Sequence, residues 1–222
     1  MVEVLKKIIF VKNLLKNGDY LFAWNGIKKR IKSENIAFGL KRDLSLEWTP
    51  PRSLINISIR PYQPNDSEYF RLDNNNHGLI EKNINTCYVA LNKDGNPCFR
   101  QWLMDSSENS KIHGFWGNSY PVLKKGEALL ESAYTVSKYR GFGVMPTATN
   151  LISEKGKEQG IKHIITFVLK DNIIALRSIV YAGYTPYIIR TEKWFLFKKK
   201  VIFSKVSDEL MTFFNKSVLR KI

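Results

Sequence analysis

Two glycines separated by one residue constrain the fold of this chain more than any other feature. The run 139–144, Tyr-Arg-Gly-Phe-Gly-Val, follows an apolar, strand-like segment (128–136) and leads into a helix-compatible segment (145–158). Glycine lets the backbone place several N–H groups on one side, and the first turn of a helix leaves its N–H groups without intrahelical partners. Such groups suit phosphate oxygens. The run therefore predicts a phosphate-binding turn with Arg140 at its rim, and a plain strand-to-helix turn is the alternative.

Length and composition indicate one folded domain with short extensions. The chain has 222 residues, 44% of them apolar, which is enough to bury a sizeable core. No stretch approaches about 18 uncharged apolar residues, so we expect no transmembrane helix. The N-terminus lacks the apolar block of a secretory signal. The two cysteines, Cys87 and Cys98, are too few for a metal site or a disulfide framework, and we expect both to be reduced thiols in the cytoplasm.

The charge balance of the chain favours an anionic partner. Its formal net charge is +15, which suits a phosphorylated cofactor, a nucleic acid or an acidic membrane face. Residues 1–35 predict two short basic amphipathic helices, because apolar residues recur at helical spacing with lysines between them. Such helices either pack on their own protein or lie on an anionic membrane. Residues 36–54 look irregular and extended and end in a linker-like Thr49-Pro50-Pro51.

From residue 55 the sequence alternates between strand-like and helix-like segments. The predicted elements are a strand at 55–59, a helix from 66 toward 74, a hairpin of strands 87–91 and 99–104, a strand at 128–136, a helix at 145–158, a strand at 161–169, a helix at 171–183, a β-rich stretch at 190–203 and a helix at 208–219. The polar stretch 105–125 carries aromatic residues, which predicts a long functional loop. This order predicts the α/β class with a mixed sheet, divided into an arm and linker (1–54), one domain (55–203) and a C-terminal helix (204–222).

The glycine turn belongs to a longer combination of features that resembles a known family. The helix and strand after the turn lead to Asn172, with Ala175 three residues later, and the next helix closes at Gly183-Tyr184. This combination resembles the GCN5-related N-acetyltransferase (GNAT) family, bacterial type, over roughly residues 55–197. The run 130–143, Leu-Glu-Ser-Ala-Tyr-Thr-Val-Ser-Lys-Tyr-Arg-Gly-Phe-Gly, is similar to the acyl-CoA strand and pyrophosphate loop of polyamine-type members. The resemblance implies a mixed, mostly antiparallel twisted sheet with flanking helices, and here a helical N-terminal arm.

The resemblance also implies a site for acetyl-CoA or another acyl-CoA, with no metal. The family pattern R-x-x-G-x-G/A falls on Arg140, Gly143 and Met145, where Met145 replaces the usual small residue and the following Pro146 lacks an N–H. The backbone of the loop would hold the pyrophosphate; its residues are Gly141, Phe142, Gly143, Val144 and Met145. The strand that pairs with the pantetheine arm and splays from its neighbour matches Ala133, Tyr134 and Thr135. Asn172 matches an asparagine that reaches the coenzyme, although it could equally cap a helix.

The implied chemistry needs a base that takes a proton from the acceptor amine. Glu131 lies where polyamine-type relatives carry a carboxylate, and strand alternation places it on one face with Ala133 and Thr135. A structural ion pair is the alternative role for Glu131, and Glu127 is the substitute base. The tyrosine that commonly protonates the leaving thiolate falls on Ile179. The usual acid is therefore absent, and Ser178 or water could serve instead.

The acceptor side of the site is less constrained by the sequence. His113 and Trp116 lie in the aromatic stretch before the acyl-CoA strand, where the resemblance implies acceptor binding; Trp116 could stack on a sugar or cover the core. His77 falls in an Asn-rich loop and His163 at the start of a strand, and neither is assigned to the site.

These residues together predict transfer of an acetyl or short acyl group from coenzyme A to a primary amine of a small acceptor. The basic surface favours an amino sugar over a free polyamine. The alternatives are a catalytically silent acyl-CoA-binding or membrane-docked protein, and an aminoacyl-tRNA-dependent transferase on the same fold. Nucleic acid is otherwise an unlikely partner. We expect a cytoplasmic protein, in which residues 1–35 either dock at the inner membrane face or pack on the protein's own core. The stretch 190–203 is a candidate homodimer surface.

Overall fold

The computed structural model describes residues 20–71, 79–80, 84 and 86–219. The strands are β1 (Lys32–Asp43), β2 (Ile57–Pro61), β3 (Cys87–Asn92), β4 (Pro97–Asp105), β5 (Glu127–Thr135), β6 (His163–Leu169), β7 (Thr185–Phe195) and β8 (Lys198–Ser204). The helices are α2 (Tyr20–Ile31), α4 (Asn109–Trp116), α5 (Val144–Glu158), α6 (Ile173–Tyr181) and α7 (Asp208–Ser217), with short 3₁₀ helices η1 (Pro64–Phe70), η2 (Ser106–Glu108), η3 (Gly117–Ser119) and η4 (Ser137–Tyr139). None of the helices in these ranges is long and apolar enough to cross a membrane.

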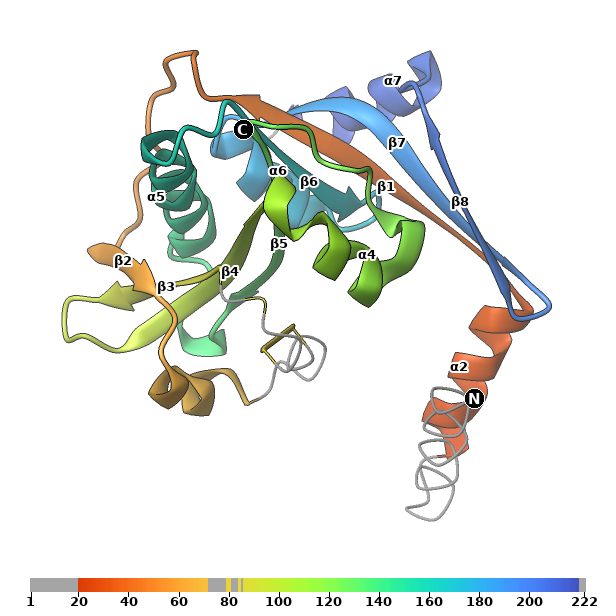
Figure 1. The fold of residues 1–222 in the computed structure, drawn as a ribbon, viewed down its shortest axis with the longest axis horizontal. Coiled ribbons are helices and arrows are strands. Elements are labelled where there is room, and N and C mark those ends of the chain that lie inside the picture. Colours follow the sequence, from red (N-terminus) through yellow and green to blue (C-terminus); the bar gives the residue numbers. More distant parts are fainter. Residues whose placement is uncertain (1–19, 72–78, 81–83, 85, 220–222) are drawn as a thin grey trace. The chain divides into compact units, whose positions relative to one another are not determined.

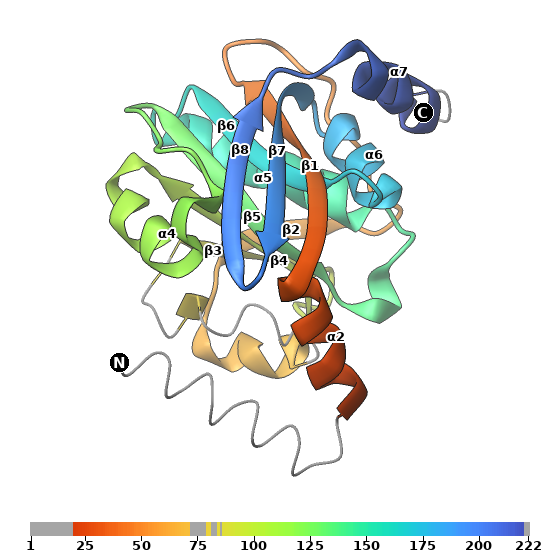
Figure 2. The ribbon, with the colours of Figure 1, turned by 90° about the vertical axis from the view of Figure 1, so that its right-hand side faces the viewer.

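The strands form one mixed sheet in the order β2-β3-β4-β5-β6-β1-β7-β8 (Figure 1). The pairs β2–β3, β3–β4, β4–β5 and β1–β6 are antiparallel, whereas β5–β6 is parallel. A second view shows β1, β7 and β8 running side by side (Figure 2). The predicted α/β class with a mixed, mostly antiparallel sheet and flanking helices is therefore confirmed.

Helices α4 and α5 cover opposite faces of the sheet. Ile112 of α4 belongs to a buried cluster with Met104 and Ile165. Gly156 of α5 packs so closely that a Cβ there would lie 3.2 Å from Leu103 and 3.3 Å from Ile164. Successive side chains of a strand point to opposite faces. Met104 and Ile165 therefore face α4, whereas their neighbours Leu103 and Ile164 face α5, and the core has one layer on each side of the sheet.

The described residues divide into two compact units. Ala37–Arg190 together with Phe203–Ile222 forms one unit, which holds the sheet core and all the predicted site residues. Met1–Ile36 together with Thr191–Ile202 forms the other, which holds α2 and the turn between β7 and β8. The second of the two predicted N-terminal helices is α2, and the first lies outside the described residues.

Three local predictions are wrong. Residues 36–43 are not irregular, because they belong to strand β1, paired with β6 from Ala37–Leu169 to Asp43–His163. The expected loop at 105–125 is largely helical, with η2, α4 and η3 in succession. The helix expected from residue 66 is instead a 3₁₀ helix, Pro64–Phe70, and residues 72–78 lie outside the description.

Strand β1 is buried because it lies inside the sheet rather than at an edge. Ala37, Phe38 and Leu40 are all buried, as expected for a short continuous apolar run with both faces covered. A Cβ at Gly39 would lie 2.7 Å from Ile188 and 2.8 Å from Phe167. Only glycine therefore fits at this crossing of β1 with its neighbours.

Candidate functional site

The parallel strands β5 and β6 pair over only three residues before they separate. Their register runs from Glu127–His163 to Leu129–Ile165, although β5 continues to Thr135 and β6 to Leu169. On its other side, β5 stays paired with β4 as far as Thr135–Phe99. The opening between the two strands is thus built into the sheet, as the resemblance implied.

A β-bulge in β5 accompanies the separation from β6. Glu131 pairs with Trp102 and Tyr134 pairs with Arg100, so the two residues between them on β5 oppose the single Gln101 on β4. Ser132 has φ of 60°, which is unusual for a non-glycine residue. Such a bulge bends its strand, and it also breaks the simple alternation that would place Glu131 on one face with Ala133 and Thr135.

A pocket of about 920 Å³ lies in the opening between β5 and β6. Its walls are residues 131–135 of β5 and 166–169 of β6, with the start of α5 and one side of α6 completing the lining. This volume is at the upper end of the usual range for small-molecule and cofactor sites. Of the predicted coenzyme residues, Phe142 alone does not line the pocket; its ring is exposed instead.

The glycine turn forms one end of this pocket. Gly141 and Gly143 have φ of 83° and 71°, and Gly143 is the N-cap of α5. A Cβ at Gly141 would meet nothing within 4 Å, because that side of the loop is open. Helix α5 begins at Val144, so the N–H groups of Val144 and Met145 have no intrahelical acceptors. Pro146 also lines the pocket but contributes no N–H.

A short segment, residues 51–54, holds the glycine turn from outside the pocket; we call it the strap. The carbonyl oxygen of Phe142 accepts hydrogen bonds from the Leu54 N–H and the Ser53 hydroxyl, both at 2.9 Å. The Thr147 hydroxyl of α5 donates to the carbonyl of Pro51 at 3.2 Å. The strap thus fixes the peptide between the two glycines, with its carbonyl directed toward the strap.

Arg140 and Asn172 both have local structural partners. The Arg140 Nε donates to the carbonyl of Thr135 at 3.1 Å, and its guanidinium lies 5.8 Å from the centre of the Tyr134 ring. This cation is exposed at the rim of the pocket, as predicted. Asn172 caps α6, its side chain accepting from the Ala175 N–H at 3.2 Å, and it also lines the pocket. Asn172 can therefore cap α6 and still contact a ligand in the pocket.

Glu131 spans the two strands at the point where they separate. Its Oε1 accepts the Phe167 N–H of β6 at 3.0 Å, and its Oε2 accepts the N–H of Ser132 at 3.3 Å. Because β5 and β6 have separated at this point, no backbone carbonyl of β5 pairs with the Phe167 N–H. The Glu131 carboxylate accepts that N–H instead. Burial raises the pKa of Glu131, while the positive charge of Arg190 and these hydrogen bonds partly oppose the shift.

The residues around Glu131 were not predicted from the sequence. The buried Tyr120 lies close enough to Glu131 and Arg190 for both charges to act on its hydroxyl, and burial raises the pKa of that hydroxyl. The Arg190 guanidinium lies 5.0 Å from the centres of both the Tyr120 and Phe167 rings, and it donates to the carbonyl of Ser119 at 3.1 Å. These side chains come from segments about 10 to 70 residues apart along the chain, so no local pattern connects them.

The predicted acceptor residues lie on α4, outside the pocket lining. Trp116 packs edge-to-face on Tyr120, with ring centres 5.1 Å apart. His113 Nε2 is buried and has no hydrogen-bond partner among the described residues. Trp116 therefore packs on Tyr120 and does not itself line the pocket. His77 lies outside the described residues, and His163 begins β6, where its Nε2 lies 3.6 Å from Asp43.

Of the other positions considered for proton transfer, Ser178 and Ile179 line the pocket and Glu127 does not. Glu127 accepts from the Lys124 N–H at 2.9 Å and does not line the pocket. Ile179, in the position of the family tyrosine, is buried and does line the pocket, as does Ser178. Within the described part of the chain, no group of three or more His, Cys, Asp or Glu side chains is placed to bind a metal.

Neither a family model nor a curated protein matches the sequence, but solved structures match the fold. One is the GCN5-related glucosamine N-acetyltransferase region of a fungal multi-domain GH3 beta-N-acetylglucosaminidase. It has a TM-score of 0.52 and 14% identity over 80% of this chain and 22% of its own. A GNAT-family acetyltransferase from Colwellia psychrerythraea has a TM-score of 0.50 and 14% identity over 79% of this chain and 60% of its own.

The chain has the GCN5-related N-acetyltransferase fold. It spans less than two thirds of the length of either matching chain. Within this GNAT fold, the glycine turn and the splayed β5 and β6 line a single pocket. The sequence predicted the glycine turn, and the family resemblance implied the splayed strand that precedes it.

Proposed function

We propose that the chain is an N-acyltransferase that moves an acetyl or short acyl group from a coenzyme A thioester to a primary amine. The observation that supports this most is one continuous pocket that joins the glycine turn to the opening between β5 and β6. A long donor with a diphosphate at one end and a thioester at the other matches such a pocket. The GNAT fold is consistent with this reading.

The donor would be held mainly by backbone groups. The N–H groups from Gly141 to Met145 suit the pyrophosphate, because two left-handed glycines and the start of α5 bring them together. Arg140 adds a positive charge at the rim. Beyond the bulge, Ala133, Tyr134 and Thr135 have no β6 partner in the parallel register, so their free edge can pair with the pantetheine arm.

Glu131 is the residue we assign as the base. An amine at neutral pH is mostly protonated and must lose a proton before it attacks a thioester carbonyl. The raised pKa of Glu131 makes its carboxylate a better proton acceptor than an ordinary glutamate. The proton would pass to it directly or through water. The departing thiolate would take its proton from water or from Ser178, because Ile179 cannot supply one.

The acceptor that we favour is an amino sugar. A chain with a net charge of +15 would repel a free polyamine, whereas a sugar nucleotide would be attracted. The fold is able to take such an acceptor, since a matching structure is described as a glucosamine N-acetyltransferase region. Trp116 and His113 of α4 remain the side chains that we propose for acceptor contact, although they lie outside the lining of the donor pocket. Cys87 and Cys98 are both buried and free, which is consistent with a reducing, cytoplasmic location.

A matched pair of substitutions at Gly141 tests the donor site. Both Gly141→Asn and Gly141→Asp have room for the new side chain, and both residues tolerate the left-handed backbone. They differ mainly by one negative charge beside the proposed pyrophosphate. We expect the Asp variant to bind acetyl-CoA on the order of tenfold more weakly than the Asn variant in calorimetry.

Equal affinity of the two variants for acetyl-CoA would place the diphosphate elsewhere. Dephospho-coenzyme A serves as a control ligand, because it keeps the pyrophosphate and should show the same difference between the variants. If the wild-type protein bound no coenzyme A thioester, the proposed function would be wrong.

A catalytically silent acyl-CoA-binding protein is the second candidate. The observation that favours it is the buried Ile179 where the family tyrosine would be. Transfer assays with acetyl-CoA and a panel of amines separate the two. Binding of the thioester without transfer to any amine would support the silent protein.

A further inference from the structure

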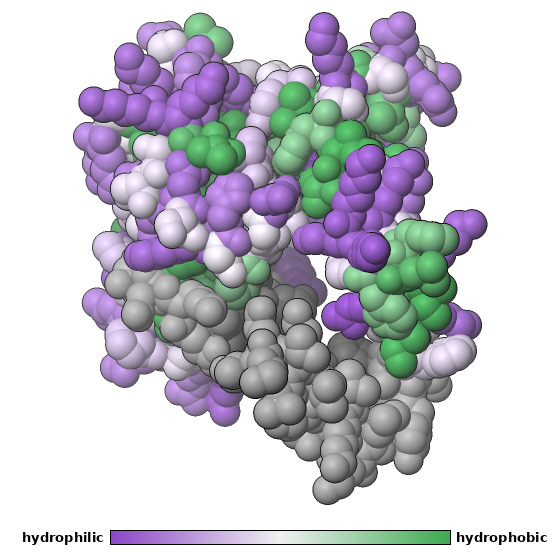
Figure 3. Space-filling model, turned by 45° about the vertical axis from the view of Figure 1, so that its right-hand side comes forward, coloured by the Kyte–Doolittle hydropathy of each residue, from purple (hydrophilic) through white to green (hydrophobic). Residues whose placement is uncertain are grey.

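The turn between β7 and β8 exposes three bulky apolar side chains in a row. Phe195, Leu196 and Phe197 are 64%, 60% and 58% exposed. We call these three residues the aromatic tip. Exposed apolar residues are ordinary when scattered, but a contiguous group marks an interaction surface. In the space-filling view, hydrophobic and strongly hydrophilic side chains lie next to each other on the surface (Figure 3).

The backbone of the aromatic tip does not favour the residues that occupy it. Leu196 and Phe197 form the two-residue turn and have φ of 44° and 64°. Two positive φ values define a turn for which Asn-Gly is preferred, because bulky side chains are strained there. The N–H groups of Leu196 and Phe197 donate to the carbonyls of Ile31 and Arg30 at 2.9 and 2.8 Å. Any residue except proline could make these bonds, so turn formation does not explain the apolar side chains.

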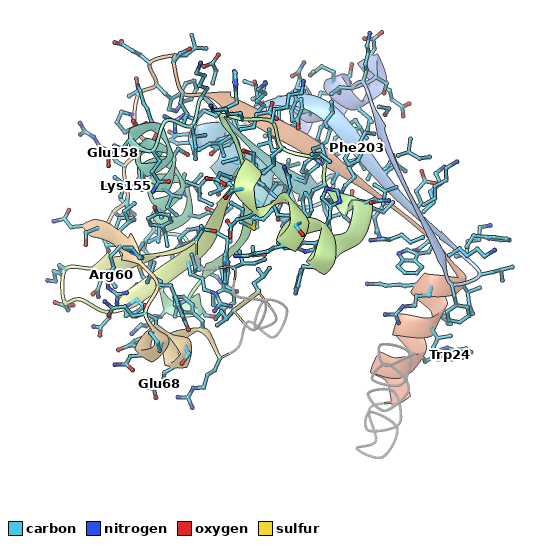
Figure 4. The ribbon with its side chains drawn as sticks, viewed as in Figure 1. Trp24, Arg60, Glu68, Lys155, Glu158 and Phe203 are labelled. Carbon is cyan, nitrogen blue, oxygen red and sulfur yellow. The ribbon has the colours of Figure 1, made fainter. Side chains whose placement is uncertain are left out.

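The compact unit that holds the aromatic tip is rich in basic residues. The described part of this unit, residues 20–36 and 191–202, holds eight basic and two acidic side chains, a net charge of +6. Lys198, Lys199 and Lys200 follow the tip directly and are exposed. One of the two acids, Glu34, already pairs with Lys193 at 3.3 Å. Trp24, 54% exposed, projects from α2 of this unit (Figure 4).

We propose that the aromatic tip inserts into the interfacial region of an anionic phospholipid bilayer. Apolar and aromatic side chains would enter the headgroup boundary while the adjacent lysines contact lipid phosphates. A hairpin turn is convex, and a bilayer accepts a convex apolar group without a matching hollow. Nucleic acid would engage the lysines but would leave Leu196 and the phenylalanines without a role.

This proposal gives the surface around the aromatic tip a different partner from the one that the sequence suggested. The sequence offered membrane docking as one of two roles for residues 1–35 and named 190–203 as a candidate homodimer surface. The aromatic tip lies within 190–203, but its side chains fit a membrane rather than a second copy of the chain. The proposal is independent of the proposed acyl transfer, so either can fail alone.

The test replaces the turn with its preferred residues in the full-length protein. A Leu196→Asn/Phe197→Gly variant removes two apolar side chains and relieves backbone strain. We expect it to melt at no lower temperature than the wild type. Its affinity for vesicles of phosphatidylcholine with 30% phosphatidylserine, added as probe, should fall on the order of tenfold or more. Val122→Ser, at another exposed apolar residue, should bind like the wild type.

A second variant tests the charge component. Lys198→Gln/Lys199→Gln/Lys200→Gln should bind these vesicles more weakly and lose much of the salt dependence. The exposed pair Lys124→Gln/Lys125→Gln removes two positive charges elsewhere on the surface and should change neither the affinity nor the salt dependence. The proposal is overturned if wild-type protein fails to bind anionic vesicles, or if the Asn-Gly variant binds them undiminished. It is also overturned if sedimentation shows a dimer that the Asn-Gly variant dissociates while vesicle binding persists.

Discussion

At the scale of single residues, Glu131 combines a structural position with a chemical one. Its carboxylate takes the N–H of Phe167 where β5 and β6 part, and it faces the charge of Arg190. The sequence identified Glu131 from its place in the strand. It could not identify Tyr120 or Arg190, because their only relation to Glu131 is contact in the folded chain. The helix cap formed by Asn172 was predictable, since a helix cap is a local pattern.

Substituting Glu131 with glutamine separates its two roles. Glutamine keeps an oxygen that can accept the Phe167 N–H but cannot take a proton from an amine. We expect Glu131→Gln to lower kcat about 10²- to 10⁴-fold and to leave the KM for acetyl-CoA nearly unchanged. Steady-state kinetics measure both constants, and unchanged turnover would assign the base elsewhere.

The same variant makes a pH test of stability possible. The folded-state pKa of Glu131 is raised above the unfolded value of about 4.3. The folded state then binds this proton more readily, so the contribution of Glu131 to stability falls as pH rises from about 4.3 through the raised pKa. Denaturant unfolding should therefore show the wild type losing stability relative to Glu131→Gln across that window. A constant difference at every pH would contradict the shift.

At the scale of elements, the strap and the glycine turn act together. The Phe142 carbonyl is held by Ser53 and Leu54, and a Cβ at Gly143 would lie only 3.1 Å from the carbonyl oxygen of Arg52. The strap thus limits how the N–H groups of the turn can orient. A loop fixed before the ligand arrives loses less entropy when it binds.

Removing the Ser53 hydroxyl should loosen the glycine turn without unfolding the protein. The hydroxyl donates to the Phe142 carbonyl and also accepts the Ile55 N–H at 3.2 Å within the strap region. The lost bond to Phe142 contributes about 0.5–1.5 kcal/mol, so we expect Ser53→Ala to weaken acetyl-CoA binding about two- to tenfold. Calorimetry gives the affinity directly. Ser107→Ala removes an exposed hydroxyl that donates to Asp105, far from the strap, and is the control. Equal affinity in both variants would show that the strap does not order the turn.

Elements with a clear period or clear end signals were predictable, and others were not. The hairpin β3–β4, strand β5 and helices α5, α6 and α7 follow from alternation, helical spacing and caps. Strand β1 was missed because Ile36–Leu40 is a short apolar run without alternation, ambiguous until its partner β6 is known. Helix α4 was missed because Gly114 and the polar residues around it suggest a loop.

At the scale of the whole sheet unit, Arg42 links three elements that are distant in sequence. From β1, its guanidinium donates to Asn150 and Glu154 of α5, each at 2.8 Å, and to the Ala182 carbonyl after α6 at 3.1 Å. Only 4% of Arg42 is exposed. Buried polar groups left without partners are costly, so this cation sets the position of both helices against the sheet.

Replacing Arg42 should therefore destabilise the unit far more than replacing a surface arginine. We expect Arg42→Met to lower the free energy of unfolding by about 2–4 kcal/mol, since it strands three buried or half-buried acceptors. Arg71→Met breaks an ion pair between Arg71 and Glu68, whose two side chains are each 72% exposed. This substitution should change the free energy of unfolding by less than about 1 kcal/mol. Urea unfolding compares the two, and similar losses would contradict the role of Arg42.

The pairing of β1 with β6 also sets the order of events during synthesis. Their paired residues are 120 (43 to 163) to 132 (37 to 169) positions apart. The ribosome therefore releases the apolar run Ile36–Leu40 long before the strand that will cover it. A nascent chain arrested before residue 163 should carry this uncovered run and be the form that general chaperones recognise.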